Sequence, residues 1–285
     1  MDITVALGGG GARGLAHLGV LRVLEREGFR IRGLAGTSMG GVIAAGYAVG
    51  RSLDELSAWA TKAMRRDLFR VRPRQASLLG TDRILGVLSE LLGEATFDGL
   101  PRALALTATN LETGQELVLT QGRVLDAVLA TIALPGIFPP QVMGGDRLVD
   151  GGVIDPVPVA PARQLWAGPV VAVALSPGPD EWPRASGSSP LASLPAFEVL
   201  SRLRAGQALH VFLRALEISA RSFTELRLIV DRPEVIVRPR VASVALFDMP
   251  SVELMMGVGE AAMREKLPEL RACFGWRARL RKLVA

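Results

Sequence analysis

The sequence predicts an α/β fold in which a largely parallel sheet carries helices on both faces. Patterns typical of strands and of helices alternate from one end of the 285-residue chain to the other. Glycine-rich turns follow the first two predicted strands, as expected where a strand leads directly into a helix. No internal repeat divides the sequence, and the length suffices for a substantial core. These observations predict one domain.

The first part of the chain supplies the clearest elements. Residues 2–7 are an apolar run that ends in four glycines, which predicts a strand and a tight turn. Leucines recur every three residues within 13–27, which predicts a helix with one buried face. The next predicted elements are a strand at 30–35, a buried helix at 39–49, a more polar helix at 52–66 and an amphipathic helix at 81–92.

The second part continues the alternation. Residues 103–109 resemble a buried strand, and the turn residues that follow predict a hairpin with 116–120. The stretch 176–196 is rich in proline, serine and glycine, which predicts a mobile surface loop that could cover a pocket as a lid. The other predicted elements are helices at 123–132, 197–220 and 250–270, and strands at 147–152, 169–175, 226–230 and 234–238.

Composition excludes several classes of protein. Apolar residues make up 49% and charged residues 21%, an ordinary globular balance without an apolar run long enough to cross a membrane. The N-terminal residues lack the basic region of a signal peptide. The single cysteine, Cys273, cannot form an internal disulfide or a zinc site. A cytoplasmic location is therefore the default expectation.

The net charge of +5 comes almost entirely from arginine and has two interpretations. It favours contact with anionic surfaces such as phospholipid headgroups, or it reflects a general preference for arginine. The one basic cluster, at 276–285, is either a short interfacial helix or a solvated terminus. We leave contact with a membrane surface and the oligomeric state open, and we expect no nucleic-acid partner.

The stretch GTSMGG places Ser38 between a predicted strand and a buried helix, with Gly36 and Gly40 on either side. In α/β sheets ligands bind at the carboxyl ends of strands. The pattern is that of a G-x-S-x-G nucleophile elbow, in which the glycines remove collisions at a sharp turn. Such a turn exposes the hydroxyl and directs the Met39 amide toward a developing negative charge.

A nucleophilic serine needs a base, and Asp150 is the better candidate. The two histidines, His17 and His210, lie within predicted helices, where a structural role is more common. Asp150 ends a predicted strand, and Gly151 and Gly152 after it leave the carboxylate exposed. A carboxylate within hydrogen-bond reach of the hydroxyl can act as general base. The alternative is that this Asp-Gly pair only opens a turn.

The run GGGGARG, residues 8–14, leaves the first strand and opens a helix. Backbone amides without side chains can line up to bind an anion, such as the oxyanion of an ester under attack, and Arg13 adds positive charge. Gly9, Gly11 and Gly14 also fit the dinucleotide-binding pattern G-x-G-x-x-G. That pattern requires an acidic residue at the end of the next strand, which this chain lacks, so nucleotide binding is disfavoured.

Taken together, GGGGARG, GTSMGG and DGG resemble the patatin-like phospholipase family in kind, order and approximate spacing. The stretches 107–122 and 130–140 resemble further segments of bacterial members. Residues 247–263 are similar to the closing helix of bacterial patatin-like proteins and of the neuropathy-target-esterase branch. The resemblance covers about residues 3–175 well and 205–270 more loosely.

This resemblance implies a single three-layer α/β/α domain over 1–285 with a mainly parallel central sheet. It implies a Ser-Asp dyad of Ser38 as nucleophile and Asp150 as base, acting on lipid acyl esters through an acyl-enzyme. It also implies that the reaction needs no metal and no cofactor. The implied oxyanion-hole residues are Gly9, Gly10, Gly11, Arg13 and Met39, and the motif glycines are Gly14, Gly36, Gly40, Gly151 and Gly152. An acyltransferase, a non-catalytic interaction module and a nucleotide-binding protein remain as alternatives.

Overall fold

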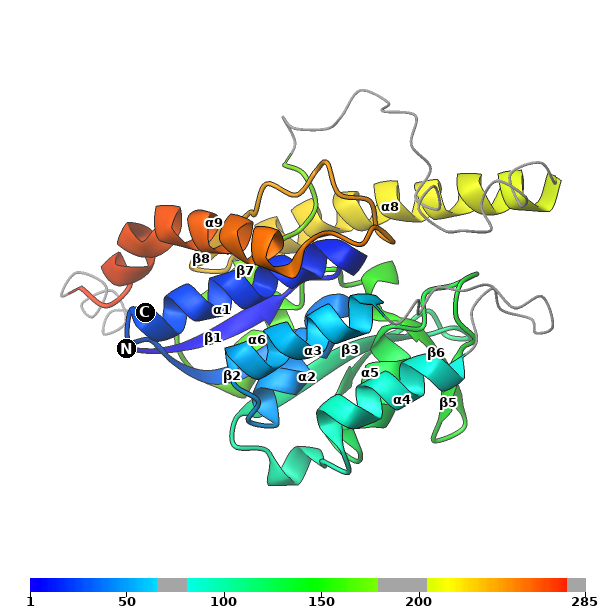
Figure 1. Cartoon of the computed structure of the whole chain (residues 1–285), viewed down its shortest axis with the longest axis horizontal. Helices are drawn as coiled ribbons and strands as arrows, with labels where there is room; N and C mark the ends of the chain where they lie inside the picture. The colour runs from blue at the N-terminus through cyan, green and yellow to red at the C-terminus, as the bar shows by residue number, and fades with distance from the viewer. Residues whose placement is uncertain (66–80, 179–203, 276–285) are drawn as a thin grey trace.

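The computed structural model describes residues 1–65, 81–178 and 204–275 (Figure 1). An eight-stranded mixed sheet forms its centre, with helices on both faces. Parallel pairing joins five neighbouring strands in the order β3, β2, β1, β7, β8, and antiparallel pairing joins β4 and β6 to β3, and β5 to β6. The strands span Asp2–Leu7 (β1), Arg30–Gly36 (β2), Ala103–Asn110 (β3), Glu116–Leu119 (β4), Gln141–Met143 (β5), Asp146–Asp150 (β6), Val170–Val173 (β7) and Val235–Val237 (β8).

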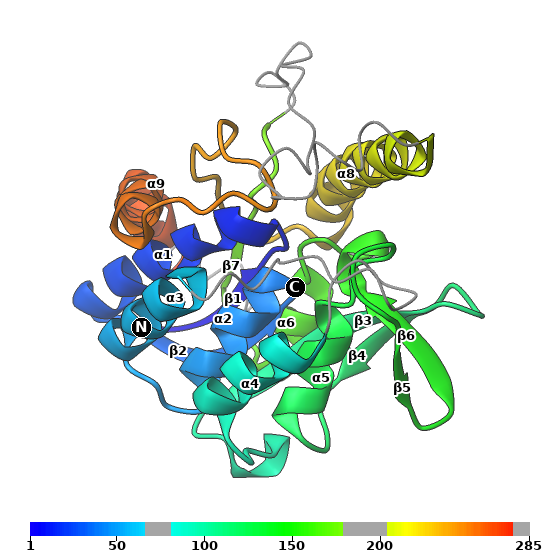
Figure 2. The same cartoon turned by 45° about the vertical axis from the view of Figure 1, so that its right-hand side comes forward.

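The helices form two layers of unequal size. The larger layer holds α1 to α5 and α9, and the smaller holds α6 and part of α8 (Figure 2). The α-helices span Ala16–Arg26 (α1), Met39–Ala48 (α2), Leu53–Arg65 (α3), Thr81–Leu92 (α4), Val124–Thr131 (α5), Val159–Leu165 (α6), Arg204–Asp231 (α8) and Val252–Ala272 (α9). Short 3-10 helices span Gly11–Leu15 (η1), Phe97–Gly99 (η2) and Gly151–Val153 (η3).

Strand β1 shows how the sequence divides the core between these layers. Because successive side chains of a strand point to opposite faces, Val5 and Leu7 join the larger core while Ala6 faces the smaller one. Pairing aligns Ala6 with Ala35, Ala105 and Ala172 of the neighbouring strands. This row of small side chains lets α6 pack closely across β1, β2 and β3.

The prediction of a strand at 226–230 is wrong, because these residues belong to the last turns of α8. A short apolar run does not by itself distinguish a strand from a helix. Leu228 packs against the smaller core, whereas Ile229 and Val230 are exposed. Helical spacing, with one residue in three or four buried, accounts for this pattern. Helix α8 therefore continues well beyond the predicted end at 220, while the predicted start at 197 lies outside the described residues.

Other boundaries also shifted. The predicted helix 13–27 begins as the 3-10 helix η1, and strand β5 and helix α6 were not predicted. Most of the predicted loop 176–196 and the basic tail 276–285 lie outside the described residues. Within the described residues, no helix has the length and apolar character needed to cross a lipid bilayer.

The sheet brings the glycine run, Ser38 and Asp150 together at the carboxyl ends of its parallel strands. Leu7 pairs with Gly36 at the carboxyl ends of β1 and β2, so the glycine run and Ser38 leave the sheet side by side. Strand β6 runs antiparallel to β3 and pairs Asp150 with Ala108, near the carboxyl end of β3. The three motifs therefore meet at the edge where α/β proteins bind their ligands.

Candidate active site

Ser38 lies on a strained turn between β2 and α2. Its φ of 54° and ψ of −126° are unfavourable for a residue with a side chain, at a typical cost of about 1–3 kcal/mol. The surrounding structure holds it there: its amide donates to Thr131 Oγ1 at 2.9 Å, and its carbonyl accepts from the Val42 amide at 3.1 Å. Strain of this kind at a half-buried serine that lines a pocket is typical of a nucleophile elbow.

The flanking glycines are required by close packing, as the sequence predicted. A Cβ atom added at Gly36 would lie 2.5 Å from Gly41 Cα, and one added at Gly40 would lie 2.1 Å from the carbonyl oxygen of Leu7. Both distances are far below van der Waals contact. At Gly14 an added Cβ would lie 2.3 Å from Met39 Cγ, so this glycine makes room for the Met39 side chain.

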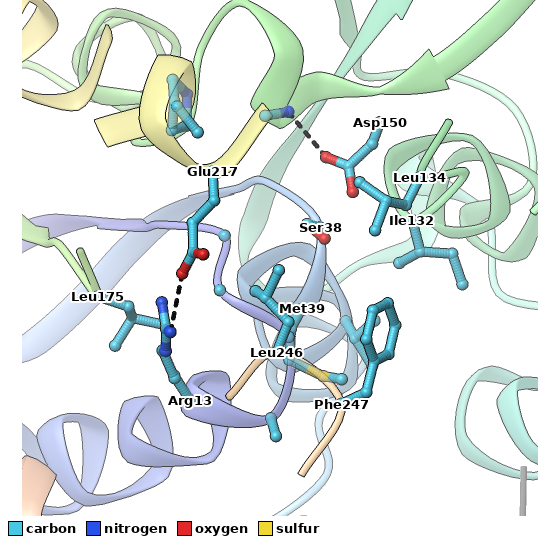
Figure 3. A pocket seen from close by; sticks show the side chains of 18 of the residues that line it. Arg13, Ser38, Met39, Ile132, Leu134, Asp150, Leu175, Glu217, Leu246 and Phe247 are labelled. Atoms are coloured by element: carbon cyan, nitrogen blue, oxygen red, sulfur yellow. Dashed lines mark hydrogen bonds and ion pairs between the residues drawn. The ribbon is translucent and has the colours of Figure 1, made fainter. Parts of the chain in front are cut away.

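Asp150 is the last residue of β6, and its buried carboxyl group opens onto the same pocket as Ser38 (Figure 3). Burial raises the pKa of Asp150 to about 6, while hydrogen bonding with the Ser38 side chain and with the Gly152 amide limits that rise. The Gly152 amide donates to Oδ1 at 2.8 Å. Gly151 has no room for a side chain, because an added Cβ would lie 2.3 Å from Thr107 Oγ1.

The glycine run passes directly beside Ser38, since a Cβ added at Gly9 would lie 3.2 Å from Ser38 Cβ, and its amides differ in their hydrogen bonding. The Gly9 amide donates to the Pro156 carbonyl at 2.9 Å, so this bond competes with the predicted role of Gly9 as an oxyanion donor. For the Gly10 and Gly11 amides, the described part of the chain provides no hydrogen-bond partner. Gly11 has a φ of 56°, and an added Cβ would lie 2.2 Å from the Leu246 carbonyl oxygen.

A helix N-terminus supplies another amide. Met39 is the first residue of α2, where the leading amides of a helix have no intrahelical acceptor. Gly10, Gly11 and Met39 thus present unpaired amides around Ser38 within the described structure, and the helix dipole favours negative charge there. These three residues line the same pocket as Ser38.

Arg13 was expected to add positive charge beside the glycine run, and the structure pairs this charge with a carboxylate. Its guanidinium donates to Glu217 Oε1 at 2.9 Å and to the Val244 carbonyl at 2.6 Å, and its side chain is 10% exposed (Figure 3). Glu217 also pairs with Arg214 at 2.8 Å. The charge of Arg13 is therefore largely neutralised.

Neither histidine lines the pocket. His17 is fully buried, burial lowers its pKa to about 4, and its Nε2 lies 2.8 Å from the Gly8 carbonyl oxygen. That contact fixes the start of the glycine run, a structural role in keeping with its position in a helix. His210 lies on α8, partly exposed.

The pocket has a volume of about 230 Å³ and lies across the edge of the sheet from one helix layer to the other. The wall from α3 and α4 is apolar. The wall from α8 mixes apolar groups with polar ones. The apolar wall is formed by Trp59, Ala60, Ala63, Met64, Ile84, Val87 and Leu88, and the α8 wall by Leu213, Leu216, Glu217, Ser219, Ala220, Arg221 and Thr224.

Sequence reasoning missed Thr131 and Glu217. Thr131 is a buried threonine at the end of the apolar helix α5, a signal that it bonds a backbone group. Glu217 carried no local signal, because its partner Arg13 is remote in sequence. Among the described residues, no group of three or more histidines, cysteines or carboxylates could hold a metal ion.

Residues 5–163 match the family model described as patatin-like phospholipase. The chain belongs to the patatin-like phospholipase family. An uncharacterized NTE family protein of Mycobacterium tuberculosis is 37% identical over 177 residues, which cover 61% of this chain and 49% of that protein. Lysophospholipase NTE1 of Mycosarcoma maydis is 34% identical over 203 residues, 66% of this chain and 10% of that protein.

A second NTE family protein of Mycobacterium tuberculosis is 29% identical and covers 93% of this patatin-like chain. The chain spans about half the length of these mycobacterial relatives, 49% of one and 46% of the other. Among solved structures, VipD from Legionella pneumophila covers 93% of this chain and 66% of its own, with 13% identity and a TM-score of 0.49.

Proposed function

We propose that this patatin-like chain is a serine hydrolase of lipid acyl esters, with Ser38 as nucleophile and Asp150 as general base. One observation carries the proposal: the strained Ser38 and the buried Asp150 carboxyl open onto one largely apolar pocket, beside backbone amides that have no partner among the described residues. Family membership and the lysophospholipase name of a relative support the same class of reaction.

The proposed reaction begins when Asp150 accepts the Ser38 proton and the Ser38 oxygen attacks the ester carbonyl carbon. The Gly10, Gly11 and Met39 amides hold the oxyanion, and each such donor is typically worth about 3–4 kcal/mol. Asp150 then protonates the departing alcohol, which leaves an acyl-enzyme. Asp150 next deprotonates a water molecule, whose attack releases the fatty acid and restores Ser38.

The substrate class follows from the two walls of the pocket. The apolar wall of α3 and α4 suits an acyl chain, and the wall of α8 adds the charged side chains of Glu217 and Arg221, which suit the polar alcohol portion of a lipid ester. Phospholipids, lysophospholipids and acylglycerols all combine an apolar acyl chain with a more polar alcohol portion. The relative's name favours lysophospholipids.

Fluorophosphonate labelling of Ser38, combined with a panel of lipid substrates, tests this proposal. We expect labelling at Ser38 and fatty-acid release in plain buffer, with long-chain esters preferred over short ones. Release only when an acceptor alcohol is added would indicate an acyltransferase. Absence of both labelling and turnover would indicate a non-catalytic module, and a thermal shift with dinucleotides would indicate nucleotide binding.

The pH dependence follows from the raised pKa of Asp150. Because only the carboxylate can accept the Ser38 proton, kcat/KM should rise with pH and level off above a midpoint at about 6. Below that pH we expect a loss of about tenfold per pH unit. The His210→Gln variant should show the same fall in kcat/KM at low pH. If this fall disappears in His210→Gln, Asp150 is not the base.

Contact with a lipid surface is a further part of the proposal, and α8 favours it. Among the side chains of α8 that the structure describes, every exposed one is uncharged, with Val211, Ile218 and Ile229 on this outer face. The N-terminal part of α8 extends beyond the sheet (Figure 1). Ser219 is exposed on this helix and also lines the pocket, so α8 lies at the pocket entrance.

Sedimentation with phospholipid vesicles tests this contact. Ile218→Glu and Ile229→Glu place a charge on the apolar face and should release the protein from vesicles, while hydrolysis of a water-soluble ester stays unchanged. Val142→Glu is the matched control, because Val142 is 72% exposed on β5, away from α8. Equal vesicle binding by all variants would contradict the contact.

A further inference from the structure

We propose that Glu217 is a positioning residue of the active site. Through its ion pair with Arg13, it holds the glycine run in the geometry that presents the Gly10 and Gly11 amides to the substrate. The inference rests on the proposed function and adds to it a residue of α8, remote from every sequence motif.

The contacts of Arg13 join three separate segments. Arg13 lies in η1, two residues after Gly11. Its guanidinium reaches α8 through Glu217, and it reaches the loop before α9 through the Val244 carbonyl. A planar guanidinium can make both contacts at once, whereas a lysine ammonium cannot match the geometry of this fork. The glycine run is therefore fixed from two sides by one side chain.

The backbone of the run is held by the same loop. The Ala12 amide donates to the Leu246 carbonyl at 2.9 Å, and this oxygen also occupies the space that a Gly11 side chain would need. A shift of Arg13 would therefore move the amides of Gly10 and Gly11, which line the pocket with Ser38. A displacement of about 1 Å in an active site can cost about a hundredfold in rate.

The charges argue against a direct electrostatic role for Arg13. Both side chains of the pair are nearly buried, 10% exposed for Arg13 and 16% for Glu217, and the carboxylate opposes the field of the guanidinium. If Arg13 acted as a bare charge on the oxyanion, Glu217 would weaken it. When Glu217 loses its charge, kcat should therefore fall if the ion pair positions the amides, and rise if the Arg13 charge acts directly on the oxyanion.

Glu217→Gln and Arg13→Lys distinguish these accounts in steady-state kinetics. If the pair positions the amides, both variants should lower kcat by about ten- to a hundredfold with little change in KM. The double variant should then be no worse than either single one, because the residues act as a unit. A direct charge predicts instead that Glu217→Gln raises kcat and that Arg13→Lys retains it; either result would overturn the proposal.

Glu225→Gln is the matched control. Glu225 lies on the same helix and pairs with Arg238 at 2.9 Å, outside the pocket. We expect this variant to keep the wild-type kcat. A loss equal to that of Glu217→Gln would show a general effect of weakening α8 and would overturn a specific role for Glu217.

Hydrogen exchange separates this proposal from the proposed function. The Ala12 amide should exchange faster in Glu217→Gln and Arg13→Lys than in the wild type, and at the wild-type rate in Glu225→Gln. This readout needs no turnover, so it tests the pair even if the wild-type chain proves inactive. Unchanged exchange at Ala12 in both variants would overturn the inference.

Discussion

The Ser38→Ala variant is expected to lose ester hydrolysis by about five orders of magnitude or more and to resist fluorophosphonate labelling. The reason is that the other hydroxyl of this turn, on Thr37, is buried and donates to the Asp155 carbonyl, whereas Ser38 lines the pocket together with the buried Asp150 carboxyl. Removing a nucleophilic serine from a comparable machinery typically costs about a millionfold in kcat. Steady-state hydrolysis of a chromogenic ester measures the loss.

The fold should survive this change. Ser38→Gly additionally removes the cost of a positive φ, so this inactive variant should be at least as stable to urea as the wild type. Ser222→Ala, on the exposed face of α8, is the matched control and should keep full activity. Retained hydrolysis in Ser38→Ala would refute the nucleophile and the proposed reaction with it.

The Asp150→Asn variant is expected to lose about four orders of magnitude in kcat. An asparagine can keep the bond from the Gly152 amide through its Oδ1, so the local structure should persist while the proton acceptor is gone. Asp146→Asn, an exposed position at the other end of β6, should behave as the wild type. Turnover near the wild-type rate in Asp150→Asn would mean that another group takes the proton.

The same variant should change how stability depends on pH. Burial raises the folded-state pKa of Asp150 to about 6 from 3.8, so the folded state binds this proton more tightly than the unfolded state. Stability from this group is present below about pH 4 and is lost as the pH rises through about 6, by about 3 kcal/mol. Relative to the wild type, Asp150→Asn should therefore gain stability toward neutral pH in urea unfolding.

Much of the fold was predictable because its signals are local. The apolar run of β1, the run of β2 into GTSMGG and the fully apolar α2 each depend on residues close together in the sequence. The strand prediction at 226–230 failed because it also relied on a local pattern alone. Their apolar pattern suits either a strand or a helix, and only packing of Leu228 against the smaller core settles it.

The sequence by itself determined the elbow at Ser38 and the glycines that its close packing requires, because these depend on the few residues around one turn. It also determined family membership, which the matched motifs carry. Only the tertiary structure decided which polar groups have partners. The Gly9 amide donates to the Pro156 carbonyl, the Ser38 amide donates to Thr131 Oγ1, and Arg13 forms an ion pair with Glu217. Those partners come from remote segments, and hydrogen bonds and burial depend on distances that no local pattern encodes.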